Sequence, residues 1–87
     1  MSTAGLIRQR LTALEPETFT LEDESAQHKG HAGAASGGGH FRLTLVSPRF
    51  RNLSTLARHR LVYETMGELM QRKIHALTIT AFTPEEL

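Results

Sequence analysis

The chain is 87 residues long, carries a formal net charge of +1 and contains no cysteine. This length predicts one small domain over residues 1–87, and the missing cysteines exclude a disulfide framework, a thiol nucleophile and thiolate metal ligands. The near-neutral charge argues against a general affinity for nucleic acid, and no apolar run approaches the roughly 18 residues that cross a bilayer. We therefore expect a cytoplasmic protein that does not enter a membrane.

The first predicted elements are a helix and a strand. Ser2 or Thr3 can cap a helix that runs to about Leu14. Pro16 ends this helix, because the residue before a proline is pushed out of the helical region. Its buried stripe consists of Leu6, Ile7, Leu11 and Leu14. Residues 18–23 then alternate between apolar and polar side chains, which predicts a short strand with one apolar face.

A glycine-rich segment follows, from about residue 24 to residue 39. It holds five of the seven glycines and two histidines, His28 and His31. Such a sequence is too rich in glycine for a regular element and too long for a tight hairpin. We predict a flexible loop, and polar loops mounted on a rigid sheet are favoured places for function.

The second half of the chain is organised around residues 58–77, RHRLVYETMGELMQRKIHAL. Before this stretch, residues 40–47 alternate as a second strand, which we expect to pair antiparallel with the first. A helical region then starts at Ser54 and continues into the stretch. Its apolar stripe consists of His59, Val62, Tyr63, Met66, Leu69 and Met70. Gly67 lies inside this helix, where we expect close packing or a slight bend.

The last strand is predicted from His75 to Phe82, where the sequence alternates again. A strand reached through a helix pairs in parallel, by a right-handed crossover. The predicted order is therefore α-β-β-α-α-β, an α+β fold whose three-stranded mixed sheet is covered by helices on one face. Residues 83–87 resemble a helix cap with no helix after it, so we expect a frayed C-terminus.

Histidines are the main candidates for a functional site, because five of them in so short a chain is unusual. His75 stands at the junction of the long helix and the last strand. His28 or His31 could join it there in a metal site, since imidazole binds iron and zinc. The simpler alternative is a solvated loop with a structural hydrogen bond at His75. His59 lies on the apolar stripe and is better explained as a histidine at the edge of the core.

The other candidate sites are weaker. A group of arginines could form a phosphate-binding patch, although the carboxylates nearby favour a solvated helix face. These arginines are Arg49, Arg51, Arg58 and Arg60. No nucleophile–base pair or carboxylate dyad stands out, and so small a chain offers little room for a pocket. We do not expect an enzyme.

Three stretches of the sequence resemble the BolA family, in the family's order. They are GGGHFRLTLVSPRF, RHRLVYETMGELM and IHALTITAFTPEE. The resemblance runs from about Leu6 to Glu86, and it is specific because the matching residues are spread over the whole segment. One departure is Asn52, where the family usually has glycine. Asparagine also adopts positive φ, so the turn is expected to be kept.

This resemblance implies a KH-like fold and a partnership with monothiol glutaredoxins in iron–sulfur cluster trafficking, cluster assembly and the regulation of iron homeostasis. In such complexes a [2Fe-2S] cluster is held by a glutaredoxin cysteine, a glutathione thiol and ligands from the BolA side. The resemblance assigns His75, in the HAL motif, as one of these ligands. It places the second ligand in the loop between the first two strands, and the chain then resembles the members that have a histidine in this loop. His28 fits this position, with His31 as the alternative. The isolated chain is expected to hold no cofactor.

Other functions stay open beside this one. Some bacterial members of the family are reported to bind DNA and to regulate transcription under stress and in cell morphology. In that case Arg49, Arg51, Arg58 and Arg60 would contact phosphates, and binding would weaken steeply with salt. The chain could also be an adaptor that binds glutaredoxin without a cluster, and weak homodimerisation is a further alternative.

Overall fold

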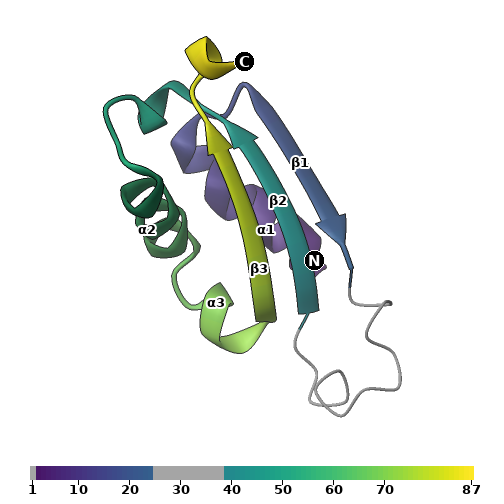
Figure 1. Cartoon of the computed structure of the whole chain (residues 1–87). Coiled ribbons are helices and arrows are strands. Elements are labelled where there is room, and N and C mark those ends of the chain that lie inside the picture. The colour runs from purple at the N-terminus through teal and green to yellow at the C-terminus, as the bar shows by residue number, and fades with distance from the viewer. Residues whose placement is uncertain (1, 25–38) are drawn as a thin grey trace.

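A mixed sheet of three strands forms the centre of the structure, a computed structural model that describes residues 2–24 and 39–87 (Figure 1). The strands are β1 (Thr18–Asp23), β2 (Gly39–Val46) and β3 (Ile74–Phe82). β1 pairs antiparallel with β2, and β2 pairs parallel with β3, in the order β1-β2-β3. These pairings confirm the sheet that the sequence predicts.

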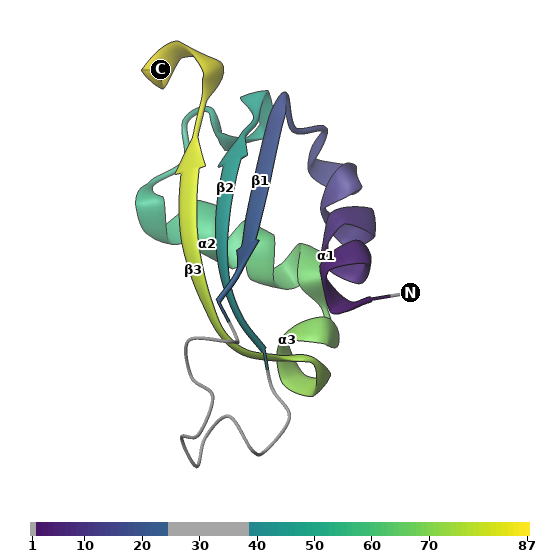
Figure 2. The ribbon, with the colours of Figure 1, turned by 90° about the vertical axis from the view of Figure 1, so that its right-hand side faces the viewer.

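Helices lie on one face of this sheet, as Figure 2 shows from the side. They are α1 (Thr3–Leu11), α2 (Thr55–Met66) and α3 (Leu69–Arg72), and short 3-10 turns form η1 (Thr12–Leu14), η4 (Pro48–Phe50) and η5 (Pro84–Glu86). The Ser2 hydroxyl accepts from the amide of Gly5 at 3.0 Å, and the Ser54 hydroxyl accepts from the amide of Ala57 at 3.1 Å. These caps satisfy amides that a helix leaves without a partner at its N-terminus. The predicted α+β architecture is therefore confirmed.

The core lies between the helices and the inner face of β2. Phe41, Leu43 and Leu45 alternate along β2 and are buried on that face. The buried side chains packed in the same cluster are Ile7, Leu11, Leu14, Phe50, Val62, Met66, Leu69, Ile74 and Ile79. Shifting β2 by one residue would turn its apolar side chains to the other face, so this burial fixes the register of the sheet.

The long helix predicted from Ser54 onward is broken at Gly67. α2 ends there, with Gly67 at φ 58° and ψ −131°, and α3 begins at Leu69. Residues that carry a side chain rarely adopt this backbone conformation. Glycine adopts it without strain, and this allows the chain to turn here. Val62 and Met66 are fully buried, as their place on the apolar stripe predicts, but Tyr63 is 41% exposed and its assignment to the buried stripe is wrong.

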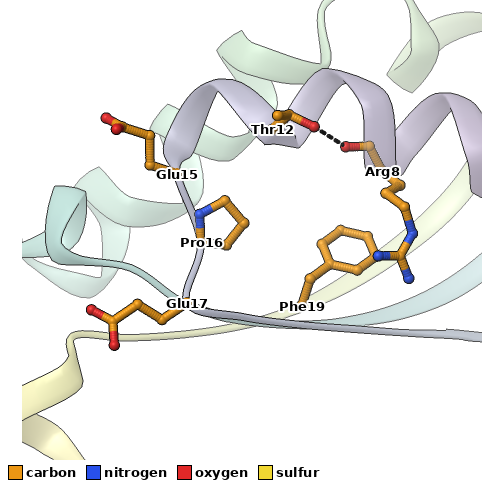
Figure 3. A pocket seen from close by; sticks show the side chains of 6 residues that line it. All are labelled: Arg8, Thr12, Glu15, Pro16, Glu17 and Phe19. Carbon is orange, nitrogen blue, oxygen red and sulfur yellow. Dashed lines mark hydrogen bonds between the residues drawn. The ribbon is translucent and has the colours of Figure 1, made fainter.

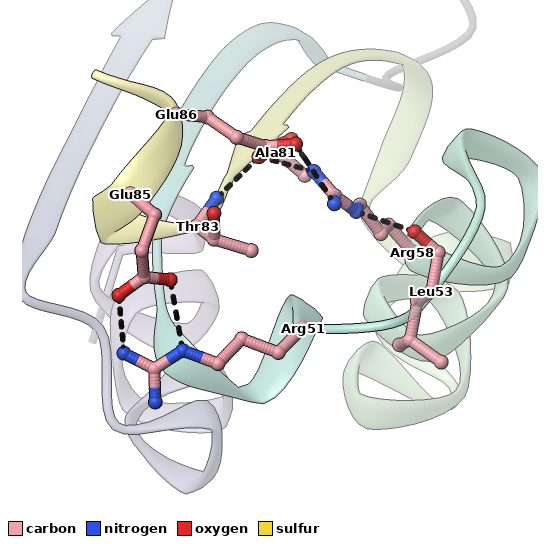
Figure 4. Close-up of polar contacts among 7 residues, drawn as sticks. All are labelled: Arg51, Leu53, Arg58, Ala81, Thr83, Glu85 and Glu86. Atoms are coloured by element: carbon pink, nitrogen blue, oxygen red, sulfur yellow. Dashed lines mark hydrogen bonds and ion pairs between the residues drawn. The ribbon is translucent and has the colours of Figure 1, made fainter.

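The C-terminal residues are held by specific contacts, so the prediction of a frayed end is wrong. Thr83 and Glu86 form a capping box, in which Glu86 Oε1 accepts from the Thr83 amide at 2.6 Å. Glu85 and Glu86 also pair with arginines from earlier segments, as Figure 4 shows. The sequence pattern shows only that no helix can follow the cap. The acidic side chains have partners far away in the sequence.

Most of the loop predicted over residues 24–39 lies outside the described residues. Glu24 directly follows β1, and Gly39 already belongs to β2.

Among the residues that the structure describes, no helix is both long enough and apolar enough to span a bilayer.

Candidate metal centre

Two histidines come together where the parallel strands begin. His40 is the second residue of β2, and His75 is the second residue of β3. Their ring centroids lie 4.9 Å apart, with the ring planes tilted by 37°. His75 is exposed and His40 is half-buried, so the pair is open to other molecules. His40 could not be identified from the sequence, because an alternating strand pattern does not show which side chain a residue meets on the neighbouring strand.

A bulge in β3 places His75 beside this neighbour. Gly39 lies opposite Ile74, but His40 lies opposite Ala76, so His75 is the extra residue in the ladder. An extra residue bends its strand and redirects a side chain, and such bulges are common next to functional sites. The contact between the imidazoles thus depends on an irregularity that the sequence pattern does not reveal.

The backbone around His40 is fixed from both sides. Its carbonyl accepts from the amide of Glu24 at 2.8 Å, and the amide of Gly39 donates to the carbonyl of Lys73 at 3.3 Å. A Cβ atom at Gly39 would come within 2.4 Å of Cε2 in the Phe41 ring. Glycine at position 39 therefore lets β2 start close to the buried ring of Phe41, and His40 lies between Gly39 and Phe41 in the strand.

The histidine pair alone does not make a metal site. Within residues 2–24 and 39–87, no group of three or more His, Cys, Asp or Glu side chains is arranged to hold a metal ion. Two imidazoles supply two neutral nitrogen donors, which leaves the other positions of a tetrahedral iron or zinc ion to ligands from elsewhere. His28 and His31 lie outside the described residues, so their role as loop ligands stays a prediction, as does the role of His75.

The arginines of the predicted phosphate patch are mostly engaged with carboxylates. Arg49 on η4 pairs with Glu15, and Arg51 donates two hydrogen bonds to Glu85, at 2.8 and 2.5 Å. The hydrogen bonds between Arg51 and Glu85 raise the pKa of the guanidinium and lower the pKa of the carboxyl. Arg60 is exposed and makes no ion pair within the described residues.

Arg58 has the most contacts of the four. Its guanidinium donates to the carbonyls of Leu53 and Ala81, at 3.0 and 2.9 Å, and to the Glu86 carboxylate at 2.7 and 3.1 Å (Figure 4). Only 12% of the Arg58 side chain is exposed. It therefore joins the start of α2, the end of β3 and the C-terminal turn, and it is not available to a phosphate without breaking these contacts.

A sequence model of the family described as "BolA-like protein" matches residues 11–86. The chain belongs to the BolA family. Members of the BolA family are not enzymes, which agrees with the expectation from the sequence. Asn52, which replaces the usual BolA glycine, has φ 64°, so the expected turn is kept.

The chain is also similar to individual BolA proteins. It is 46% identical over 81 residues to BolA-like protein 1 of Mus musculus. This alignment covers 92% of this chain and 57% of the mouse protein. It is 34% identical over 87 residues to the DNA-binding transcriptional regulator BolA of Haemophilus influenzae, which covers 99% of this chain and 82% of that protein. The chain thus spans little more than half the length of the mouse relative.

A solved BolA structure has the same fold. The structure of BolA1 from Arabidopsis thaliana superimposes with a TM-score of 0.86 at 37% sequence identity, covering 100% of this chain and 97% of the other. The three-stranded mixed sheet with its helices is therefore the BolA fold, as the sequence resemblance implied.

Proposed function

We propose that this protein binds a monothiol glutaredoxin and shares with it and with glutathione a [2Fe-2S] cluster, for which His75 is one ligand. The protein would act in iron–sulfur cluster trafficking or in the regulation of iron homeostasis, with the cytoplasm as the expected compartment. The observation that carries the proposal is the contact of His40 with His75 at an exposed strand bulge. Membership of the BolA family supports it.

The available donors fit a shared cluster better than a site within this chain alone. The chain has no cysteine, so any thiolate must come from another molecule. Two imidazoles on one iron and two thiolates on the other is the ligation of Rieske centres, in which neutral nitrogen donors raise the reduction potential. The role of this chain would be to hold the cluster through imidazole nitrogens and to present it to the partner.

The second histidine ligand is one of three residues. His28 follows Glu24 by four residues and is tethered within about 14 Å of it, because an extended chain spans at most about 3.6 Å per residue. His31 is tethered within about 25 Å by the same reasoning. The amide of Glu24 binds the carbonyl of His40, so both tethers start beside the histidine pair. His40 joins His28 and His31 as a candidate because it already contacts His75.

Anaerobic reconstitution with a monothiol glutaredoxin and glutathione, followed by circular dichroism in the visible region, tests this proposal. The mixture should give a spectrum distinct from that of glutaredoxin alone. His75→Ala should abolish the difference, and so should one substitution among His28→Ala, His31→Ala and His40→Ala, which names the second ligand. His59→Ala is the matched control, because His59 is a half-buried histidine of α2 outside the pair.

Two other results would be informative. A spectrum identical to that of glutaredoxin alone would rule out cluster sharing. If the two proteins still eluted together in that case, the chain would be an adaptor without a cluster.

DNA binding is the second candidate, because the relatives from Haemophilus influenzae and Escherichia coli are named DNA-binding transcriptional regulator BolA. The arginine contacts argue against it as the main role. Arg49, Arg51 and Arg58 each pair with a glutamate, so phosphates would have to compete with carboxylates already in place.

A further inference from the structure

β1 forms an open edge of the sheet in the part of the chain that the structure describes, where its strand partner is β2. In an antiparallel pair, the backbone groups of alternate residues point toward the neighbouring strand and the others point away. Glu24 donates its amide to the carbonyl of His40, and the pairing of Thr20 with Thr44 continues the same register. The amides and carbonyls of Phe19 and Leu21 therefore point outward, where a further strand could bind them.

A cavity beside this edge can receive the side chains of an added strand. It lies between α1 and the start of β1 and has a volume of about 500 Å³ (Figure 3). The residues lining it are Arg8, Thr12, Glu15, Pro16, Glu17 and Phe19. The volume is sufficient for one or two side chains, and the lining combines a cation, carboxylates and an aromatic ring.

Arg8 is the cation that this cavity offers. Its guanidinium carbon lies 4.5 Å from the centroid of the Phe19 ring, and this stacking holds the charge beside the edge strand. Within the described residues, the Arg8 side chain has no hydrogen bond or ion pair. Its N–H donors are therefore open to a carboxylate of an incoming strand.

We propose that this edge binds β1 of a second copy of the chain, antiparallel about a two-fold axis at Leu21. In this register Leu21 lies opposite Leu21, and Phe19 lies opposite Asp23 of the second copy. Residues directly opposite each other in an antiparallel pair point to the same face of the sheet. Asp23 of the second copy thus enters the cavity over Phe19 and meets Arg8, and the axis repeats this contact on the other side.

Charge selects this register over its neighbours, because like charges placed opposite each other destabilise a strand pair. With the axis at Phe19, the Arg8 side chains of the two copies would meet. With the axis at Thr20, Glu17 would lie opposite Asp23 of the second copy. With the axis at Leu21, Glu22 lies opposite Thr20, and the acidic Asp23 meets a cation.

The association should be weak. The contact involves one edge strand and one cavity, and small interfaces of this kind give transient complexes. We expect a monomer–dimer equilibrium that becomes visible only at high protein concentration.

Sedimentation equilibrium over a wide range of protein concentration tests the proposal. Arg8→Glu and Asp23→Arg each put like charges into both symmetric contacts, and each should weaken dimerisation by about tenfold. The double variant restores both ion pairs with reversed signs and should recover most of the wild-type affinity. Arg60→Glu is the matched control, since it makes the same change at an exposed arginine of α2 and should leave the equilibrium unchanged.

Hydrogen exchange of individual amides locates the interface. The amides of Phe19 and Leu21 should exchange more slowly as concentration rises, whereas the Thr20 amide faces β2 and should be protected at every concentration. A chain that stays monomeric throughout, or that dimerises equally well in both single variants, would overturn the proposal. A dimer that leaves the amides of Phe19 and Leu21 unaffected would overturn it too. If only an acidic peptide slowed these amides, the edge would belong to a different protein.

Discussion

At the scale of single residues, Arg58 shows how one side chain can join distant parts of a small domain. Its guanidinium reaches two backbone carbonyls and the Glu86 carboxylate, although Glu86 follows it by 28 residues. Arginine suits this position because its planar group presents several N–H donors in fixed directions. A lysine would keep the charge but could not make all of these contacts in the same geometry.

This contact predicts a specific dependence of stability on pH. The hydrogen bond from Arg58, followed by that from the Thr83 amide, lowers the pKa of Glu86 from 4.5 to about 2. A carboxylate with a lowered pKa contributes stability that is complete above its ordinary pKa and is lost as the pH falls through the folded-state value. Glu86 is 43% exposed, so solvent screening keeps the effect small.

We therefore expect the wild-type melting temperature to exceed that of Glu86→Gln by a constant margin above pH 4.5, and this margin to shrink toward pH 2. Thermal unfolding followed by circular dichroism across this range measures it. Glu64→Gln is the control, because Glu64 is exposed and has no ion pair among the described residues. A margin that persists undiminished at the acid end would contradict the role of the ionised Glu86.

The sequence predicts a residue's conformation or role well where these depend on that residue and its immediate neighbours. The turn at Asn52 could be predicted because positive φ is a property of one residue and its type. His40 and the arginine–glutamate pairs could not, because each depends on which segments the fold brings together. His75 stood out only through its position at a junction, and nothing local indicated the imidazole beside it.

At the scale of elements, the break between α2 and α3 is where the sequence pattern misled. The apolar spacing continues from Met66 to Leu69, so the periodicity alone indicates one uninterrupted helix. The strands were easier to predict, because alternation and burial on one face of β2 agree. The bulge at His75 left no trace in that alternation, since it arises from pairing with β2.

Substitution of Gly67 distinguishes a broken helix from a continuous one by the sign of its effect. In a continuous helix, Gly67→Ala would stabilise the protein by about 1 kcal/mol. In the structure Gly67 has φ 58°, and an added Cβ would lie 3.0 Å from Nη1 of Arg10, which donates to the carbonyl of Met66. We therefore expect Gly67→Ala to lower the free energy of unfolding by about 1–3 kcal/mol.

Urea denaturation measures the effect of Gly67→Ala. Asn52→Gly is a useful comparison, because relieving the positive φ of an asparagine should be neutral or slightly stabilising. An increase in stability for Gly67→Ala would mean that α2 and α3 form one helix in solution.

At the scale of the whole molecule, the two candidate functions use opposite ends of the sheet. β2 and β3 run in parallel, with His40 and His75 where they begin. The C-terminal turn lies beyond the other end of these strands (Figure 1), and Arg51 and Arg58 pair with its two glutamates. A glutaredoxin docked at the histidine end would therefore leave the arginine end uncovered. The two functions can be tested separately on this account.

Because Glu15 and Glu85 pair with Arg49 and Arg51, we predict that these glutamates keep the two arginines from binding DNA phosphates. Glu15→Gln combined with Glu85→Gln would release Arg49 and Arg51 and raise the formal net charge from +1 to +3, since two negative charges are removed. Each arginine that neutralises a phosphate adds about 0.9 to the slope of log affinity against log salt. We expect the double variant to bind a DNA duplex more tightly at low salt, with a slope steeper by about 1.8.

Fluorescence anisotropy with a labelled duplex over a salt series measures this change. Glu22→Gln combined with Glu64→Gln is the matched control, because it alters the net charge equally at exposed glutamates without ion pairs in the described residues. If both double variants gained the same slope, general charge would explain the effect and the pairs would mask nothing. A steeper slope confined to the Glu15 and Glu85 variant would show that the released arginines contact phosphate, and that carboxylates of the same chain hold this surface back.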